Sequence, residues 1–354
     1  MDLRTFGWDE DFARHFEPFG QRGLSVARVT LEHQHIYTVQ TAEGELLATV
    51  AGGLRHRAAG RHEFPAVGDW VAMSPPAQSG RGVIQAVLPR RSKFSRKVSG
   101  RVTTEQVVAA NIDTVFLMMG LDGDYNLRRI ERYLITAFDG GASPVVVLNK
   151  ADLCADVAAR VREVQAVAQS APVHAVSTMQ DGLLDVLDVY LGAGRTIALL
   201  GSSGVGKSTL VNRLVGHAMQ ATREVREGDQ RGRHTTTRRQ LIVVTGGALL
   251  IDTPGLRELQ LWDGAGGIDQ TFDDIEVLGA GCRFRDCRHD AEPGCAVKAA
   301  AGAGQLDGSR LESYLLLRRE RAFLAGQQDE RVAQERKRYA RTISKVLRDF
   351  KPRE

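Results

Sequence analysis

The sequence predicts an α/β protein in which a parallel-sheet domain lies between a small N-terminal β-barrel and a helical C-terminal segment that contains a cysteine cluster. Three observations support this fold class. Strand-like runs fill residues 24–101, apolar strands alternate with helix-like segments after residue 107, and three of the 4 cysteines fall between residues 282 and 295. Because 354 residues exceed one ordinary domain, we expect three parts, residues 1–105, 106–270 and 271–354.

The barrel is predicted from five runs rich in β-branched residues, which turn residues separate. These runs are Leu24–Leu31, His35–Gln40, Leu46–Ala51, Asp69–Ser74 and Gly82–Leu88. Five strands of this length fit a small barrel, and an oligonucleotide-binding fold is one candidate. A small barrel that binds no ligand fits the strand count equally well.

The central part is predicted to form βαβ units, because apolar runs alternate with segments of helical spacing. We expect strands over residues 112–118, 144–148, 173–176, 196–200, 241–244 and 249–251, and helices over residues 127–138, 155–169, 183–191 and 210–215. Strands that are apolar throughout favour a parallel sheet buried on both faces. Gly192-Ala193-Gly194 is expected to form a flexible link before the strand at 196–200.

A glycine-rich loop joins that strand to the following helix. The loop is Gly201-Ser202-Ser203-Gly204-Val205-Gly206-Lys207-Ser208-Thr209, which satisfies the pattern G-x-x-x-x-G-K-[ST] in its required strand–turn–helix context. The glycines let backbone N–H groups surround phosphate oxygens at a helix N-terminus. Lys207 can reach the β- and γ-phosphates, which makes it a candidate catalytic residue, and the Ser208 hydroxyl can bind Mg²⁺. The loop predicts a nucleoside triphosphate but does not identify the base.

A second loop at the end of a strand predicts that the base is guanine. Asn149-Lys150-Ala151-Asp152 follows the apolar run at 144–148. The Asp152 carboxylate can accept hydrogen bonds from N1–H and the 2-amino group of guanine, whereas adenine offers it an acceptor. Ser177 and Thr178 end the next strand and are candidates for supporting the base from the other side. Four letters alone also fit a plain strand-end turn.

A third segment predicts a Mg²⁺ site and a switch. Asp252-Thr253-Pro254-Gly255 follows a strand and has the pattern D-x-x-G, in which Asp252 holds Mg²⁺ through water and the Gly255 amide approaches the γ-phosphate. Upstream lies the polar stretch Gly232–Thr237. We expect Thr236 to complete the Mg²⁺ shell when the γ-phosphate is present, with Thr235 and Thr237 as alternatives. A plain surface loop is the other interpretation of this stretch.

The residue after the D-x-x-G glycine predicts slow intrinsic hydrolysis. Ras-like proteins have a glutamine there that orients the attacking water, but this chain has Leu256, which cannot hydrogen-bond to water. Another group must then supply the polar contact, and His234 is our candidate. His234 could instead only hold its loop.

These guanine-nucleotide motifs occur in circularly permuted order, since the base loop precedes the phosphate loop. At this point the chain resembles the ribosome small-subunit-dependent GTPase A family, and the resemblance covers nearly the whole chain. The residues that carry it are Asn149–Asp152, Gly201–Thr209, Gly232–Thr237, Asp252–Gly255, Gly68-Asp69-Trp70-Val71, Leu88-Pro89-Arg90-Arg91-Ser92 and the cysteine/histidine cluster described next.

The resemblance implies a late assembly factor that docks on the small (30S) ribosomal subunit and its rRNA. It also implies GTP hydrolysis to GDP and phosphate that the subunit stimulates, and an oligonucleotide-binding fold for the N-terminal barrel.

The cluster Cys282-x₄-Cys287-x-His289-x₅-Cys295 offers three thiolates and one imidazole. This set suits one structural Zn²⁺ in tetrahedral coordination, and a short loop-rich segment needs such a staple because it buries little apolar surface. The spacing matches the zinc site of the family. Three free thiols that lie close together by chance are the alternative. Arg283, Arg285 and Arg288 alternate with the ligands and could face RNA.

Positive charge is concentrated in two segments. Residues 54–101 hold ten Lys and Arg against two Asp and Glu, and residues 318–354 hold twelve against six, although the whole chain carries only +4. Basic segments favour a polyanionic partner, though solvated surface charge is the alternative. The candidates for phosphate contacts are Arg90, Arg91, Lys93, Arg96, Lys97 and Arg101 around Phe94, and Arg336-Lys337-Arg338 in the tail.

The remaining expectations concern the environment and competing functions. Without a signal-peptide pattern or a long apolar run, we expect a cytoplasmic monomer that binds GTP or GDP and no membrane. Two other functions fit parts of the sequence. One is a phosphate-loop ATPase or kinase that carries N-K-A-D by chance, and the other is a zinc-stapled RNA-binding module that only senses a nucleotide.

Overall fold

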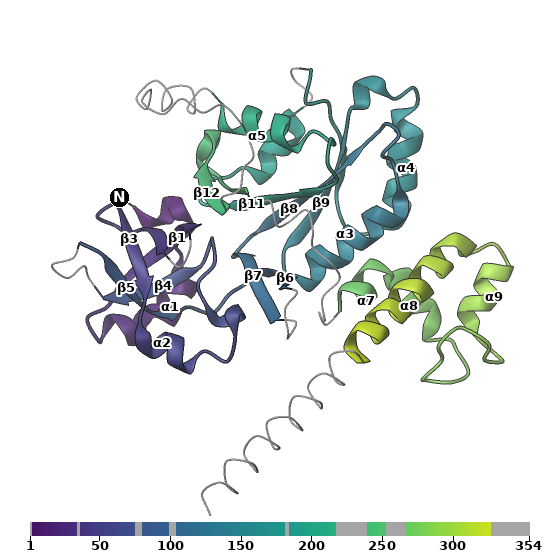
Figure 1. Ribbon diagram of the computed structural model, residues 1–354. Helices are drawn as coiled ribbons and strands as arrows, with labels where there is room; N and C mark the ends of the chain where they lie inside the picture. The colour runs from purple at the N-terminus through teal and green to yellow at the C-terminus, as the bar shows by residue number, and fades with distance from the viewer. Residues whose placement is uncertain are drawn as a thin grey trace, which may run out of the picture. The chain divides into compact units, whose positions relative to one another are not determined.

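The computed structural model describes residues 2–33, 36–74, 80–98, 104–180, 184–216, 239–252 and 266–326. The chain divides into two compact units, Met1–Gln260 and Leu261–Glu354. Figure 1 colours the first unit from purple to green and the helices of the second in green and yellow. The predicted boundaries after residues 105 and 270 remain predictions.

The first unit begins with a helical segment that the sequence analysis did not anticipate. It comprises the 3₁₀ helix η1 (Leu3–Phe6) and the helix α1 (Glu10–Gly20). Asp9 caps α1, because its carboxylate accepts hydrogen bonds from the N–H groups of Asp11 and Phe12. Phe12 is buried, and the ring of Trp8 packs against the buried Trp70 with ring centroids 4.8 Å apart. This segment therefore packs against the barrel.

The five predicted barrel strands are confirmed to within two residues at each end. They are β1 (Ser25–His33), β2 (Ile36–Gln40), β3 (Glu45–Val50), β4 (Trp70–Ser74) and β5 (Gly82–Val87), with the short helices α2 (Gly52–Arg57) and η2 (Arg61–Glu63) between β3 and β4. The strand order is β1-β2-β3-β5-β4, and β4 pairs back with β1. Among the described strands of the barrel, β3 and β5 pair in parallel and the other neighbours pair in antiparallel. The barrel is therefore closed, as in an oligonucleotide-binding fold, and Val29, Val39 and Ile84 lie among the buried residues of its core.

A two-stranded hairpin follows the barrel where the sequence analysis predicted no strands. It pairs β6 (Lys93–Val98) with β7 (Thr104–Ala110) in antiparallel. Phe94 is buried in this hairpin and lies against Gly140, where an added Cβ would come within 2.8 Å of the ring. Phe94 is thus part of the core of the unit.

The predicted α/β domain is confirmed. Its strands are β8 (Thr114–Gly120), β9 (Ser143–Asn149), β10 (Val173–Ala175), β11 (Thr196–Gly201), β12 (Arg239–Val243) and β13 (Leu249–Asp252). They follow the order β10-β9-β8-β11-β13-β12, and only β12 runs antiparallel to its neighbour β13. The strand β11 therefore lies between a strand that precedes it in the chain and one that follows it, as the permuted motif order requires.

Helices cover both faces of this sheet. They are α3 (Leu127–Asp139), α4 (Val157–Ala168) and α5 (Lys207–Val215), with the 3₁₀ helices η3 (Ala151–Leu153), η4 (Asp185–Tyr190) and η5 (Thr245–Gly247). Apolar residues of α3 and α4 pack with one face of β8, whereas those of α5 and η4 pack with the other (Figure 1). The helix expected over residues 183–191 is a 3₁₀ helix of six residues, Asp185–Tyr190.

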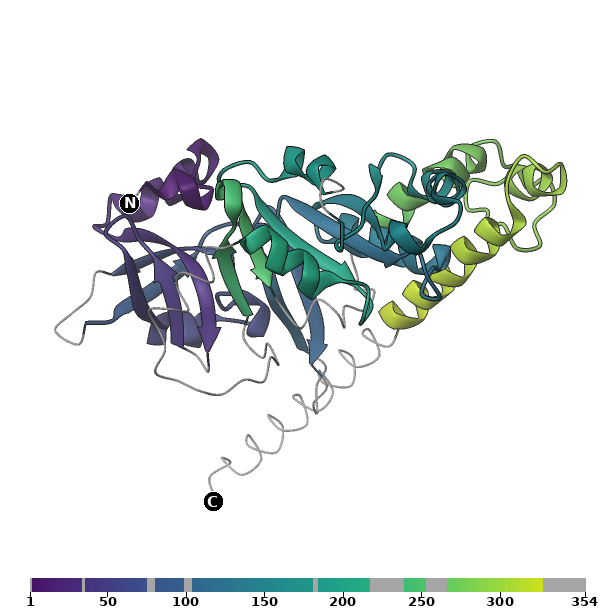
Figure 2. The same ribbon diagram turned by 90° about the horizontal axis from the view of Figure 1, so that it is seen from above.

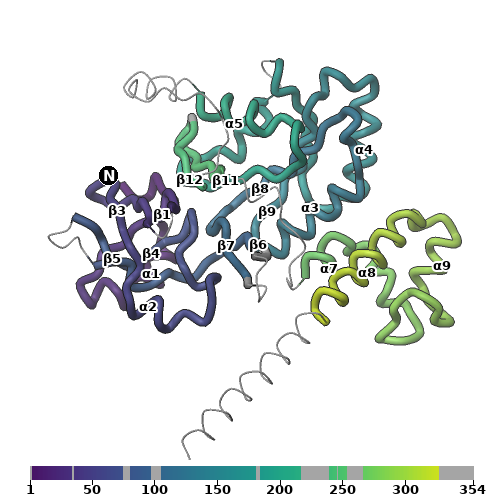
Figure 3. The backbone as a smooth tube through the Cα atoms, viewed as in Figure 1, coloured from purple at the N-terminus to yellow at the C-terminus, as the bar shows by residue number. Residues whose placement is uncertain are grey.

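The link at residues 192–194 is held by defined contacts. The Gly194 N–H donates to the Gly247 carbonyl at 3.0 Å. Gly194 has a φ of +75°, and an added Cβ would lie 2.7 Å from the Arg4 carbonyl oxygen. The N-terminal segment and the η5 turn therefore both contact this link, whose flexibility remains a prediction (Figure 3 traces the backbone).

The barrel and the α/β domain share one continuous sheet of 11 strands. The junction is the antiparallel pairing of β1 with β12, in which Leu31 lies opposite Gln240. Figure 2 shows the same ribbon from above, with the barrel in purple and blue and β12 in green. The Arg28 side chain, 1% exposed, donates to the Thr196 hydroxyl at 2.9 Å and to the Asn111 and Gly68 carbonyls at 3.2 Å. Burial lowers the Arg28 pKa to about 10, so the guanidinium stays charged at neutral pH.

The second unit is helical and small. It contains α7 (Gly267–Thr271), α8 (Asp273–Gly279), α9 (Ala296–Gly302) and a helix over residues 308–326. Arg310 joins its own helix to α7 and α8, because its guanidinium donates to both Asp274 carboxylate oxygens at 2.7 Å and to the Thr271 carbonyl at 2.9 Å. Among the described residues of the whole chain, no helix has the length and apolar character needed to cross a membrane.

Candidate functional site

The predicted base loop and phosphate loop meet at the carboxyl edge of the parallel sheet. Asn149, at the end of β9, is 1% exposed. Its amide donates to the Val205 carbonyl in the phosphate loop at 2.7 Å and to the Thr178 hydroxyl at 3.2 Å. Its side-chain oxygen accepts from the Thr178 N–H at 3.0 Å. One buried side chain thus joins the three loops that the sequence analysis assigned to guanine-nucleotide binding.

The phosphate loop connects β11 to α5 around an open pocket of about 240 Å³. The residues that line the pocket are Ser203, Gly204, Gly206, Lys207, Ser208 and Thr209. Gly204 and Gly206 have φ of +79° and +104°, values that let the loop reverse without strain. At Gly206 an added Cβ would lie 2.2 Å from the Asn149 amide nitrogen. Only glycine therefore fits this position.

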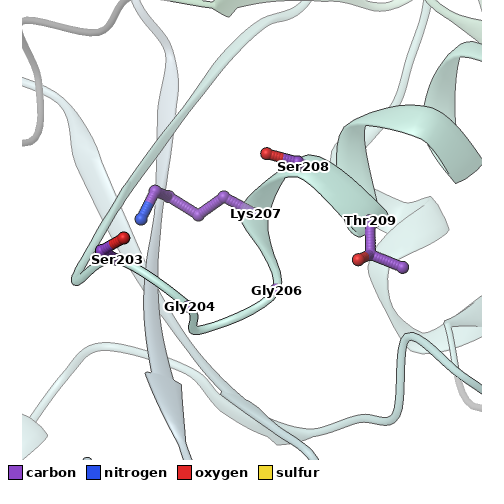
Figure 4. A pocket seen from close by; sticks show the side chains of 6 residues that line it. All are labelled: Ser203, Gly204, Gly206, Lys207, Ser208 and Thr209. Carbon is purple, nitrogen blue, oxygen red and sulfur yellow. The ribbon is translucent and has the colours of Figure 1, made fainter. Parts of the chain in front are cut away.

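The Lys207 amine lies inside the loop. Lys207 extends from the start of α5 back toward the segment that carries Ser203 (Figure 4). Its ammonium donates to the Gly201 carbonyl at 2.6 Å and also to the Ser202 carbonyl. The side chain places a positive charge beside the N-terminus of α5, and both features favour an anionic ligand.

The base loop turns sharply after β9. Lys150 has a φ of +63°, a left-handed conformation that is uncommon for a residue with a side chain, and it precedes the 3₁₀ helix η3. Asp152 lies on this helix and is exposed. Ser177 is fully buried, and its hydroxyl accepts from the Met179 N–H at 3.2 Å. The Ala151 N–H donates to the Val176 carbonyl at 3.1 Å, which ties the base loop to the neighbouring strand end.

Two aspartates in the turn after β8 also contact these loops, and the sequence analysis missed both. Asp122 accepts a hydrogen bond from the Lys150 ammonium at 2.6 Å, and this bond lowers the pKa of the carboxyl. Asp124 accepts from the Ser202 hydroxyl and from Arg129. Partial burial opposes ionisation of Asp124, but these two hydrogen bonds outweigh it and lower its pKa. Their signal in the sequence was their position at the end of a strand that borders β11.

The structure describes only part of the predicted Mg²⁺ and switch segments. Ser208 is exposed at the start of α5. Asp252 ends β13, which pairs in parallel with the phosphate-loop strand β11, so both strands end at the same edge. Gly255, Leu256, His234, Thr236 and the rest of the Gly232–Thr237 stretch lie outside the described residues.

The cysteine/histidine cluster is assembled in the second unit. The ligand atoms of Cys282, Cys287, His289 and Cys295 all lie within 4.8 Å of one another. His289 Nδ1 lies 3.6 Å from Cys282 Sγ and 3.4 Å from Cys295 Sγ, and the two sulfurs are 3.9 Å apart. Tetrahedral Zn²⁺, with bonds of about 2.3 Å to sulfur and about 2.0 Å to nitrogen, requires ligand atoms about 3.5–3.8 Å apart. The distances among Cys282, His289 and Cys295 are close to this spacing, and with Cys287 the four side chains could hold a metal ion.

Local backbone and electrostatics favour this ligand set. His289 has a φ of +60° and Gly294 a φ of +75°, and these turns direct the loop back toward Cys295. The Cys295 sulfur caps α9, because it accepts from the Lys298 N–H at 3.5 Å. Partial burial lowers the pKa of His289, which keeps the imidazole neutral at neutral pH, as a metal ligand must be.

Two residues of the basic cluster predicted around Phe94 are paired with carboxylates, and the phosphate contacts of this cluster remain a prediction. The Arg90 guanidinium donates to both oxygens of Asp69, at 2.8 and 2.7 Å, and that carboxylate is fully buried. Arg91 binds Asp9 and Asp11, and its guanidinium lies 4.0 Å from the centroid of the Phe12 ring. Arg90 therefore pairs with the residue that precedes β4, and Arg91 joins the segment after β5 to the start of α1. Arg101 and Arg336-Lys337-Arg338 lie outside the described residues, whereas Arg283, Arg285 and Arg288 are exposed as expected.

Comparison with known proteins agrees with this geometry. The family described as RsgA GTPase matches residues 87–262. A curated protein from Opitutus terrae named "Small ribosomal subunit biogenesis GTPase RsgA" is 49% identical over 94% of this chain and 93% of its own length. A protein of the same name from Syntrophotalea carbinolica is 44% identical over 96% and 95%, respectively.

Solved structures share the fold. YjeQ from Thermotoga maritima is 28% identical, with a TM-score of 0.63 over 84% of this chain and 99% of that chain. A structure described as YloQ, a circularly permuted GTPase, has a TM-score of 0.59 over 84% and 95% at 23% identity, and it supports the fold alone. Because the sequence identity extends over nearly the whole length of the relatives, this chain belongs to the RsgA GTPase family and is a circularly permuted GTP hydrolase.

Proposed function

We propose that this GTPase acts in the late maturation of the small ribosomal subunit, that it binds the subunit and its rRNA, and that the subunit stimulates its GTP hydrolysis. The relatives that match over nearly the full length are named as biogenesis GTPases of that subunit. The structural observation that carries the nucleotide assignment is the Asn149 network, which joins a phosphate loop to an N-K-x-D loop. A chance occurrence of N-K-A-D does not explain this contact.

Different residues of the site would bind the base and the phosphates. Asp152 would accept from the guanine edge, and Asn149, Ser177 and Thr178 would hold the loops that surround the base. Residues 201–206 would donate backbone N–H groups to the phosphates, and Lys207 would move from the loop carbonyls to the β- and γ-phosphate oxygens.

The metal and switch residues complete the proposal. Ser208 and Asp252, together with Thr236, would hold Mg²⁺, whose charge would offset that of the phosphates. Gly255 would donate its amide to the γ-phosphate. His234 would orient the attacking water, because Leu256 cannot.

The cysteine/histidine cluster would hold one structural Zn²⁺. All four positions would be taken by Cys282, Cys287, His289 and Cys295, so no position is left for substrate. The exposed side chains of Arg283, Arg285 and Arg288 alternate in sequence with the ligands and would contact rRNA phosphates.

GTP turnover with and without purified small ribosomal subunits, at two salt concentrations, tests this proposal. We expect slow release of phosphate by the chain alone, a large increase with subunits, and a smaller increase at higher salt because phosphate contacts weaken. Lys207→Ala is the control, and it should abolish turnover in both conditions. Equal turnover with and without subunits at low salt would overturn the proposed stimulation.

A further inference from the structure

The turn between β8 and α3, residues 121–126, contacts both nucleotide loops through separate carboxylates. It is fixed to the sheet because the Leu121 N–H donates to the Asn149 carbonyl at 2.8 Å. Within the turn, Asp122 Oδ1 accepts from the Asp124 N–H at 3.0 Å, and the Tyr125 N–H donates to the Asp122 carbonyl at 3.1 Å. The turn is therefore a rigid element at the edge of the site.

The other carboxylate oxygen of Asp122 contacts the base loop. Asp122 Oδ2 lies 2.6 Å from the Lys150 ammonium, and both side chains are under one-third exposed. The resulting ion pair is shielded in part from solvent, and the hydrogen bond from Lys150 lowers the pKa of Asp122, which favours the charged carboxylate further. The pair links a rigid turn to the one residue of the base loop that has a left-handed backbone.

The backbone of Lys150 decides where Asp152 lies. A positive φ is unfavourable for a residue with a Cβ, so the base loop keeps it only while surrounding contacts hold it. Lys150 leads directly into the 3₁₀ helix η3, which carries Asp152. If Lys150 relaxed to a negative φ, η3 and Asp152 would change direction relative to the sheet edge.

The opposite side of the same turn is tied to the phosphate loop. Asp124 accepts from the Ser202 hydroxyl and is paired with Arg129, whose N–H also donates to Asn126 at the start of α3. Tyr125 in addition donates its hydroxyl to Glu163 of α4 at 2.8 Å. These contacts hold the turn in place independently of Lys150, so Asp122 can act as a fixed partner for it.

We propose that Asp122 is a positioning residue for guanine recognition, which acts by holding Lys150 and thereby aiming Asp152 at the base edge. The inference rests on the proposed role of Asp152 as the reader of guanine. Asp122 would act through Lys150, its partner at 2.6 Å, and not through a contact of its own with the nucleotide. Its effect should therefore appear in the discrimination between bases and not only in overall affinity.

The affinities for GDP and IDP test this inference, since inosine lacks only the 2-amino group that Asp152 would bind. Asp122→Asn keeps the oxygen that accepts from the Asp124 N–H and removes the charge that pairs with Lys150. We expect the ratio of GDP to IDP affinity to fall about fivefold, as for the loss of a partly exposed ion pair. Glu163→Gln is the matched control, because it also replaces a carboxylate by an amide but keeps an oxygen that accepts from the Tyr125 hydroxyl, so the turn stays held and the ratio should not change.

The outcomes separate the two levels of the proposal. If Asp152→Asn reduces the ratio of GDP to IDP affinity but Asp122→Asn does not, the role of Asp122 is overturned and that of Asp152 stands. A ratio that Asp152→Asn does not change overturns both. If Asp122→Asn does not fold, Asp122→Ser provides the same comparison, since a serine hydroxyl can also accept from the Asp124 N–H and carries no charge.

Discussion

Replacing Asn149 with alanine should weaken nucleotide binding far more than it weakens the fold elsewhere. The side chain makes three hydrogen bonds at 2.7–3.2 Å and is 1% exposed. Its loss leaves the Val205 carbonyl and the Thr178 N–H without this partner. Each buried polar group without a partner costs about 1–3 kcal/mol. Because water from the nearby pocket can form some of the missing hydrogen bonds, we expect the two groups together to cost about 2–3 kcal/mol.

This cost should appear mainly as weaker nucleotide binding, because Asn149 joins the base loop to the phosphate loop and to the loop that contains Thr178. The dissociation constant for GDP should then rise about 30- to 150-fold. Titration with fluorescent GDP measures it, and urea unfolding followed by circular dichroism measures the stability. Asp156→Ala, which removes the cap of α4, is the control and should cost about 1 kcal/mol of stability without a change in GDP affinity. A GDP affinity of Asn149→Ala within twofold of wild type would refute the reasoning.

Three further predictions concern the barrel and the second unit. Arg90→Met leaves the buried carboxylate of Asp69 without its ion-pair partner, so the free energy of unfolding should fall by about 3–5 kcal/mol. Urea titrations measure this change, and a fall below about 1 kcal/mol would contradict the structural role of the pair. Cys287→Ser, or a strong chelator, should release one Zn²⁺ per chain and reduce the helix content, whereas an unchanged circular dichroism spectrum would mean that the second unit folds without metal. The hydrogen bond from Arg91 lowers the pKa of Asp9 from its usual 3.8, so this stabilisation is present above pH 3.8 and is lost as the pH falls through the lowered pKa. Below about pH 4 the urea midpoint of the wild type should therefore decline more steeply than that of Asp9→Asn, and parallel declines would exclude this contribution.

Local sequence patterns predicted the barrel strands and the nucleotide loops, which depend mainly on residues close together in the chain. The barrel strands followed from β-branched runs between turns, and the nucleotide loops followed from glycines and polar residues at the ends of apolar strands. The helix α1 was missed although Phe12, Phe16 and Phe19 have helical spacing and Asp9 is a capping residue. Pro18 lies inside this helix and breaks the pattern that identifies helices from sequence.

The features that we could not predict from the sequence depend on contacts between residues far apart in the chain. A run of basic residues predicts surface charge, but the Arg90 side chain is only 13% exposed because Asp69, 21 residues earlier in the chain, folds next to it. Asp122 and Asp124 belong to no motif, and their roles depend on partners 28 and 78 residues away. The meeting of residues 149–152 with residues 201–209 was predicted because both motifs end strands of one parallel sheet.

The pairing of β1 with β12 has a consequence for dissecting this protein. In the intact unit β12 has a neighbour on each side, β13 and the first strand of the barrel. A shortened chain that begins after the barrel would leave one row of β12 backbone groups open to solvent, and such an edge pairs readily with other chains. Aggregation of that fragment would then reflect a missing strand and would say nothing about the stability of the nucleotide site.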